Sequence, residues 1–279
     1  MKTHPRSKLS VCLLLFTMLA GSAARAQDKP PASAPPGAPE ASAPGFVYLV
    51  RTDLRDVLGG PVHWDSRQWG QFGIAMAGIG ASALLDSTIR DHERNRHSHT
   101  ADQVAKDFEQ FGEAGAFGVM GTFYVVGLAS NDARARSVGA DGLIASVISG
   151  AIIAPVLKFA VGRVRPRDTE KTFELHPFSG NSSFPSGHTT EAFTVASVIS
   201  TQYPAVWVRV VTYGSAALVG YARIHHQAHF FSDVTAGAVL GTATGLAVVH
   251  RNEEERRKYV LMPVVGPHGE PGVGVALSF

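Results

Sequence analysis

The sequence predicts an all-α fold, a compact bundle of about six core helices, followed by a short C-terminal β-hairpin. Two observations predict the helices. From about Trp69 onward the chain alternates apolar runs with polar connections, and each run is longer than a typical strand and rich in Gly and Ala. A third observation, the alternation of apolar and small residues near the C-terminus, predicts the hairpin. The apolar runs are Gly70–Leu85, Ala114–Ser130, Gly142–Val161, Thr190–Tyr203, Val206–Ala222 and Val234–Val249.

Smaller features indicate how these elements meet. Glycines at 78 and 80, and at every fourth residue from Gly237 to Gly245, predict that neighbouring helices approach closely. The charged connection 86–113 is expected to contain a further amphipathic helix. The hairpin is expected to join 259–265 to 273–279 through a turn rich in Gly and Pro, and to pack on the bundle.

The first 26 residues have the pattern of a cleaved signal peptide. A basic start precedes the apolar stretch 9–21, which is too short for an ordinary membrane span, and Ala24-Arg25-Ala26 has the form of a cleavage site. We therefore expect export. Residues 27–45 are rich in Pro and Ala and predict a disordered linker. Residues 46–279 are expected to form one domain, with its catalytic core at about 142–250.

Composition excludes several classes of function. Residues 1–26 carry four basic and no acidic side chains, so the net charge of +2 becomes about −2 after cleavage. That charge leaves no electrostatic footprint for nucleic acid. The single cysteine, Cys12, lies in the signal, so we expect no disulfide and no thiolate metal site in the mature protein.

The first polar motif pairs Lys158 with Arg165, which is followed by Pro166. The two cations are seven residues apart, which is two helical turns, so both can face one side if the helix persists. Pro166 forbids further helix and pushes Arg165 toward an extended conformation. Such cations would bind phosphate oxygens. The alternative is that Lys158 only reaches solvent from an apolar helix.

The second motif is Ser186-Gly187-His188, between Pro185 and an apolar helical run. A loop that leads into a helix N-terminus offers free backbone N–H groups and a positive dipole, so it predicts an anion site. The Ser186 hydroxyl can add a hydrogen bond, and Gly187 lets an oxyanion approach the backbone. His188 then stands beside the anion and can act as a general acid. The alternative is an N-capping serine next to an incidental histidine.

The third motif contains Arg223, His229 and Asp233. On a helix, Asp233 could reach the imidazole of His229, fix its tautomer and leave the other ring nitrogen as a nucleophile. Arg223 offers a planar fork for two phosphate oxygens. A rival interpretation places His225, His229 and Asp233 on one metal-binding helix face. It gives no role to the three cations of the motifs, which would repel a divalent ion, so we expect no metal.

In order and spacing, the three motifs K-x6-R-P, P-S-G-H and R-x5-H-x3-D resemble those of the type 2 phosphatidic acid phosphatase (PAP2) superfamily. That group includes bacterial acid phosphatases, lipid phosphatases and vanadium haloperoxidases. The stretch from Ser232 to Gly241 is also typical of it, and the helix pattern extends the resemblance over roughly 70–249. One departure is Ala222, where the family usually has a serine before the arginine, so a hydroxyl contact is lost from the phosphate pocket.

The resemblance implies a phosphatase acting on phosphate monoesters, including lipid phosphates or lipid pyrophosphates. His229 would attack phosphorus and form a phosphohistidine, oriented by Asp233. His188 would protonate the leaving oxygen and later assist water. The resemblance implies no metal and no organic cofactor, and vanadate would mimic phosphate. The phosphate oxygens would be held by Lys158, Arg165, Ser186, Gly187 and Arg223.

Two other functions stay open. One is a vanadate-dependent haloperoxidase using the same oxyanion cradle, although the chain is short for that branch. The other is a non-catalytic phosphate- or lipid-binding module. The expected partner is a phosphorylated small molecule or lipid. For location, a periplasmic or envelope-associated bundle is favoured, because three spans after signal cleavage would leave Arg165 in the cytoplasm. An integral inner-membrane protein is the alternative.

Overall fold

The computed structural model describes residues 46–95, 99–109, 112–258, 260–265 and 271–276. The chain separates into two compact units, and Pro44–Glu254 is the unit that holds the polar motifs. The predicted signal peptide (1–26) and the whole of the predicted linker (27–45) belong to residues outside this description. The helices are α2 (Phe46–His63), α3 (Ser66–Ala83), α4 (Asp86–Arg94), α5 (His99–Glu109), α6 (Glu113–Ala129), α7 (Ala133–Ser146), the π-helix η1 (Val147–Ile153), α8 (Ala154–Val161), the 3-10 turn η2 (Pro166–Asp168), α9 (Gly187–Gln202), α10 (Val206–His225) and α11 (Phe231–Lys258).

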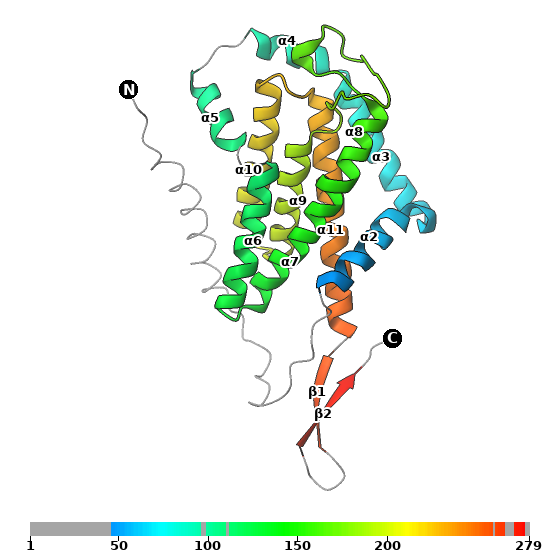
Figure 1. The fold of residues 1–279 in the computed structure, drawn as a ribbon, viewed down its shortest axis with the longest axis vertical. Helices are drawn as coiled ribbons and strands as arrows, with labels where there is room; N and C mark the ends of the chain where they lie inside the picture. Colours follow the sequence, from blue (N-terminus) through cyan, green and yellow to red (C-terminus); the bar gives the residue numbers. More distant parts are fainter. Residues whose placement is uncertain (1–45, 96–98, 110–111, 259, 266–270, 277–279) are drawn as a thin grey trace. The chain divides into compact units, whose positions relative to one another are not determined.

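The unit Pro44–Glu254 is a helical bundle, as predicted. Helix α6 packs on α7, α7 packs on α9, and α9 packs on α10, while the short helix α5 covers α10. Figure 1 shows α6, α7, α9 and α10 running alongside one another. Fully buried side chains fill the space between them, among them Met120, Ile144, Val198 and Val219. The all-α prediction is confirmed for this unit.

The predicted helix at 142–161 ends where expected but begins earlier. It starts at Ala133, because an Asp132 oxygen accepts hydrogen bonds from the backbone N–H groups of Arg134 (2.8 Å) and Ala135 (3.1 Å). The polar first turn of α7 concealed this start from the apolar pattern. Gly162 ends α8 in the left-handed conformation (φ 59°), which glycine adopts without strain.

Two segments differ from the sequence prediction. Helix α2 lies ahead of Trp69 and was missed, because polar residues and Pro61 interrupt its apolar side chains. The charged connection 86–113 contains two helices, α4 and α5, where one amphipathic helix was expected.

The glycines of α11 bring that helix against α9. A β-carbon at Gly237 would lie 2.6 Å from the carbonyl oxygen of Ser186, and one at Gly241 would lie 2.9 Å from the backbone nitrogen of Thr194. Close approach of these helices is therefore confirmed. At Gly78 and Gly80 no described atom lies within 4 Å of such a β-carbon, so the corresponding prediction for α3 is wrong there.

Two strands belong to the second unit of the chain. Strand β1 (Val260–Val265) pairs antiparallel with β2 (Pro271–Ala276), and Val260 lies opposite Ala276. The side chains of these strands are outside the described residues. The predicted packing of a hairpin on the bundle stays a prediction.

Apolar side chains cover the outside of several helices. Ile74 on α3, Val125 on α6, Val156 on α8 and Val210 on α10 are each more than 60% exposed. By length and composition, two helical stretches of the described chain could cross a membrane, Ala133–Val161 and Phe231–Arg256. A third would arise if α3 and α4, bent by 45°, formed one span. Exposed apolar faces of this kind are typical of surfaces that contact lipid or another protein.

Candidate active site

Lys158 and Arg165 sit on either side of the end of α8. Lys158 lies in its last turn, whereas Arg165 is extended (φ −77°, ψ 152°) immediately before Pro166. The prediction for Arg165 is confirmed. The helix does not persist from Lys158 to Arg165, because α8 ends at Gly162 in the left-handed conformation, so the two cations do not share a helical face. One Arg165 nitrogen donates to the Ser182 hydroxyl (3.0 Å).

The Ser186-Gly187-His188 motif opens α9, as predicted. Ser186 is the N-cap residue and is fully buried; its carbonyl accepts from the backbone N–H of Thr190 (2.9 Å). Its own N–H donates to the backbone carbonyl of Asp233 (3.0 Å), which fixes this loop to the start of α11. Its hydroxyl accepts from that of Thr189 (2.9 Å). His188 occupies the first turn, on the end of α9 that carries the positive dipole.

The third motif spans two helices. Arg223 lies in the last turn of α10, His229 in the connection that follows, and Asp233 in the first turn of α11. His229 Nδ1 lies 2.6 Å from the carbonyl oxygen of Ser183 but 3.9 Å from Asp233 Oδ2. A carbonyl can only accept, so Nδ1 carries the proton and Nε2 keeps its lone pair.

The predicted direct bond from Asp233 to His229 is therefore replaced by an indirect one. Because α11 begins at Phe231, His229 is outside the helix and the four-residue spacing does not align the two side chains. Asp233 accepts instead from the Ser183 hydroxyl (2.6 Å) and from the N–H of Phe230 (2.9 Å). It thereby fixes the residue whose carbonyl orients the imidazole.

Arg163 is a site residue that the sequence analysis missed. Its guanidinium, which is almost fully buried, donates to Asp233 Oδ1 (2.6 Å), Ser232 Oγ (2.8 Å) and Asp86 Oδ2 (2.8 Å). Asp86 also accepts from the Ser232 hydroxyl (2.6 Å) and N–H (2.9 Å). The available signal was a charged residue inside the otherwise apolar spacer between Lys158 and Arg165.

The ring of His229 lies in a cationic, dry environment. Its residue is 3% exposed. Burial, followed by the charges of Lys158 and Arg223, holds the pKa of His229 well below its ordinary value, with a smaller contribution from Arg165. The three predicted phosphate-binding cations therefore lie near His229, and together with burial they lower the pKa of its ring.

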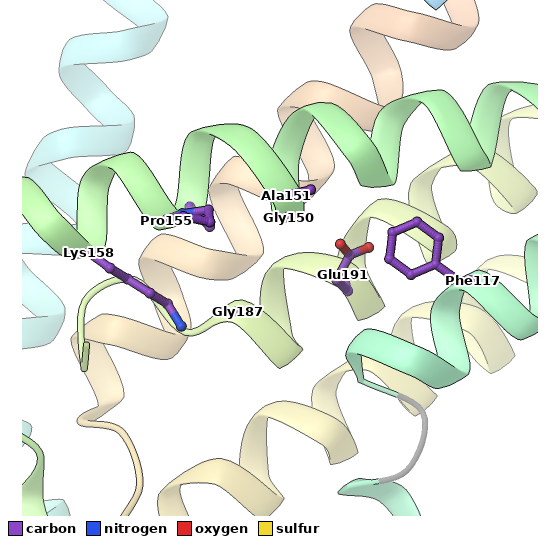
Figure 2. A pocket seen from close by; sticks show the side chains of 8 residues that line it. Phe117, Gly150, Ala151, Pro155, Lys158, Gly187 and Glu191 are labelled. Atoms are coloured by element: carbon purple, nitrogen blue, oxygen red, sulfur yellow. The ribbon is translucent and has the colours of Figure 1, made fainter. Parts of the chain in front are cut away.

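A pocket of about 240 Å³ adjoins Lys158 and Gly187 (Figure 2). Figure 2 shows the Lys158 side chain reaching from α8 toward Gly187, while Phe117 from α6 lies beside Glu191 of α9. Glu191 is 2% exposed and was not predicted. The pocket thus has a cationic end and an end with an aromatic ring. Its lining residues are Phe117, Gly150, Ala151, Ala154, Pro155, Lys158, Gly187 and Glu191.

The part of the chain that carries the three motifs matches a known protein family. The family model described as "PAP2 superfamily" matches residues 141–257, which include all three motifs. The segment 141–257 of this chain belongs to the PAP2 superfamily.

Several PAP2 relatives are similar over part of their length. The lipid A 1-phosphatase of Rhizobium johnstonii is 36% identical over 104 residues, which are 36% of this chain and 42% of that protein. The undecaprenyl-diphosphatase of Sulfolobus acidocaldarius is 30% identical over 110 residues, 39% of this chain and 52% of that protein. The chain therefore spans about half or less of these curated relatives. The crystal structure of Aquifex aeolicus LpxE aligns with a TM-score of 0.48 and 23% identity, covering 60% of this chain and 95% of that one.

His225, which the metal hypothesis used, contacts two carboxylates that lie outside the PAP2 motifs. Its Nδ1 lies 2.8 Å from Glu93 Oε2 on α4, and its Nε2 lies 2.8 Å from Asp102 Oδ1 on α5. His225, His229 and Asp233 therefore do not share a helix face. Burial opposes the charge on His225, but the two carboxylates outweigh it and raise the pKa of the imidazole above its ordinary value.

This contact predicts a pH-dependent stability. Since the pKa of His225 is raised by folding, its contribution should be complete below about pH 6.5 and lost as pH rises through the folded pKa. His225→Gln should therefore lower the unfolding temperature more at pH 6 than at pH 9. Thermal unfolding across that range tests it. A pH-independent difference between the two proteins would contradict it.

The low pKa of His229 predicts a pH–rate profile. Wild-type kcat/KM should persist below pH 6.5, because the proposed nucleophile stays neutral there. Lys158→Met removes a positive charge near the ring, which makes imidazolium easier to form. The acid limb of the profile should then move to higher pH, together with a lower maximal rate. An acid limb that stays in place in Lys158→Met would show that His229 does not control it.

Proposed function

We propose that the protein is a metal-independent lipid-phosphate phosphatase that works through a phosphohistidine at His229. The observation that carries this proposal is the arrangement at His229. Its Nδ1–H is held by the Ser183 carbonyl at 2.6 Å, and its pKa is lowered by burial and by Lys158 and Arg223. A neutral, oriented imidazole among fixed cations suits attack on an anionic phosphoryl group.

Each site residue has one proposed role in a two-step reaction. Nε2 of His229 attacks phosphorus, the bond from phosphorus to the leaving oxygen breaks, and His188 gives that oxygen its proton. In the second step His188 takes a proton from water, which attacks phosphorus and releases phosphate from His229. During both steps the phosphate oxygens would be held by Lys158, Arg165, Arg223, the Ser186 hydroxyl and the backbone N–H of Gly187.

Three observations support a lipid as the leaving group. The pocket beside Lys158 continues to Phe117, and apolar side chains cover the outer faces of α3, α6, α8 and α10. Two helical stretches of the described part of the chain are long and apolar enough to cross a membrane. Relatives of the chain are a lipid A 1-phosphatase and an undecaprenyl-diphosphatase. We therefore place the protein in a membrane of the cell envelope, in preference to the periplasmic bundle that the sequence favoured.

The test is phosphate release by the detergent-purified full chain. Lipid A, an undecaprenyl diphosphate and a phosphatidic acid would be compared with a sugar phosphate and a nucleotide. Lipid substrates should give kcat/KM values at least about tenfold higher. Equal rates on soluble substrates would contradict the lipid assignment. Vanadate-dependent halide oxidation, or binding without turnover, would replace the proposal by the haloperoxidase or the binding module.

A further inference from the structure

The N-terminus of α6 touches the side chain of His188. We infer that Gly112, the N-cap residue of α6, positions the imidazole of His188 and that a larger residue there would misplace the general acid. The inference rests on the proposed function, in which His188 protonates the leaving oxygen. No part of the three motifs contains Gly112, which lies about thirty residues before the matched family region.

The contact is one that only glycine allows. A β-carbon at Gly112 would lie 2.5 Å from Cγ and 2.7 Å from Cβ of His188, and it would also overlap Cδ2. Real β-carbons do not approach other atoms this closely, so something would have to move. The backbone of Gly112 does not itself demand glycine, because φ −70° and ψ −165° are open to any residue. The requirement therefore comes from the ring.

The backbone on either side is fixed, so the ring is the part that must move. The Gly112 carbonyl accepts from the N–H groups of Gly115 (2.8 Å) and Ala116 (3.2 Å), which starts α6. Ala116 and Met120 are buried and seat α6 in the bundle. On the other side, Ser186 ties the start of α9 to α11. Rotation of the ring cannot relieve the overlap with Cβ of His188, so a methyl group at Gly112 would displace the whole side chain, imidazole included.

Displacement of a general acid has a specific kinetic result. A shift of about 1 Å can cost a factor of about a hundred in rate. The loss falls on leaving groups that need a proton, such as alkoxides. A nitrophenolate leaves without one, so kcat/KM for a nitrophenyl ester, which reports the first step alone, should be nearly unaffected. A general weakening of the fold would lower both rates together.

The experiment compares 4-nitrophenyl phosphate with an alkyl phosphate on the full chain. For Gly112→Ala we expect kcat/KM to fall about 10- to 100-fold on the alkyl phosphate and less than about threefold on the nitrophenyl ester. Gly118→Ala and Gly121→Ala are matched controls on the same helix, because no described atom lies within 4 Å of their β-carbon positions. Both should behave as wild type.

A second substitution distinguishes a displaced His188 side chain from a misfolded protein. In a His188→Gly background the three overlapping atoms are gone, so Gly112→Ala should change neither the unfolding temperature nor the rate further. Equal losses on both substrates, no loss at all, or an additive loss in the His188→Gly background would each overturn the inference. If the wild type released no phosphate from either ester or from a lipid phosphate such as phosphatidic acid, the proposed function itself would fail, and that result is distinguishable from the others.

Discussion

Replacing His229 with alanine is expected to abolish both turnover and the trapped phosphoenzyme. The variant keeps the cations that bind phosphate but lacks the nitrogen that forms the covalent bond. Loss of the nucleophile in covalent catalysis lowers kcat on the order of 10⁴–10⁶-fold. Because Lys158, Arg165 and Arg223 remain, KM should change much less. Quenched-flow labelling with a radioactive phosphate ester, stopped in alkali, measures the phosphohistidine directly.

The matched control for this variant is His250→Ala. His250 also follows an apolar stretch, but it is exposed on α11 and has no role in the proposed reaction. It should retain the wild-type rate and the wild-type amount of phosphoenzyme. Ordinary turnover by His229→Ala would remove the basis of the mechanism. Loss of the phosphoenzyme in both variants would point instead to damage that is not specific to His229.

Arg163→Met is expected to destabilise the protein strongly as well as inactivate it. Both carboxylates paired with Arg163, those of Asp86 and Asp233, are fully buried. Removing one partner of a buried ion pair leaves an uncompensated charge, at a cost of about 3–5 kcal/mol. Activity should fall too, because Asp233 holds the Ser183 hydroxyl and the Ser183 carbonyl orients His229. Urea unfolding in detergent and kcat on the same preparation measure the two effects.

Two further variants test the reason for this loss. Arg167→Met removes an exposed arginine whose nearest carboxylate, on Asp168, is 3.7 Å away, so it should cost less than about 1 kcal/mol. Adding Asp86→Asn to Arg163→Met removes one stranded charge and should restore part of the stability. If Arg163→Met unfolded at the same urea concentration as Arg167→Met, the buried pairs would not be the source of stability.

The local features of the fold and the site followed from the sequence, whereas the tertiary contacts did not. Pro166 sets the extended conformation of Arg165, and Ser186 begins α9, because both effects act on neighbouring residues. The bond from Arg163 to Asp86 joins residues 77 positions apart, and no periodicity connects them. The Ser183 carbonyl that orients His229 is a backbone group, which every residue carries, so the sequence could not single it out.

The glycine spacing predicted helix contacts correctly in one helix and wrongly in another, again because tertiary contacts are not encoded locally. The spacing on α11 and that on α3 both suggested close packing, yet only the α11 glycines have a neighbour within reach. A small residue permits approach but does not specify which helix arrives. For Asp233 the sequence predicted the wrong hydrogen-bond partner. Because α11 starts at Phe231, Asp233 accepts from the Ser183 hydroxyl instead of from His229.

The ion pair between Arg163 and Asp86 has a consequence for how the protein can be divided. The matched family region, 141–257, contains every motif, but Asp86 lies outside it, as do the Glu93 and Asp102 partners of His225. A fragment beginning at residue 141 would leave Arg163 with one of its two carboxylates and Ser232 without the acceptor of its N–H. The segment 141–257 is therefore not expected to keep its structure when it is transferred alone. A chimera that grafts it onto another PAP2 scaffold needs the N-terminal helices α4 and α5 to come with it.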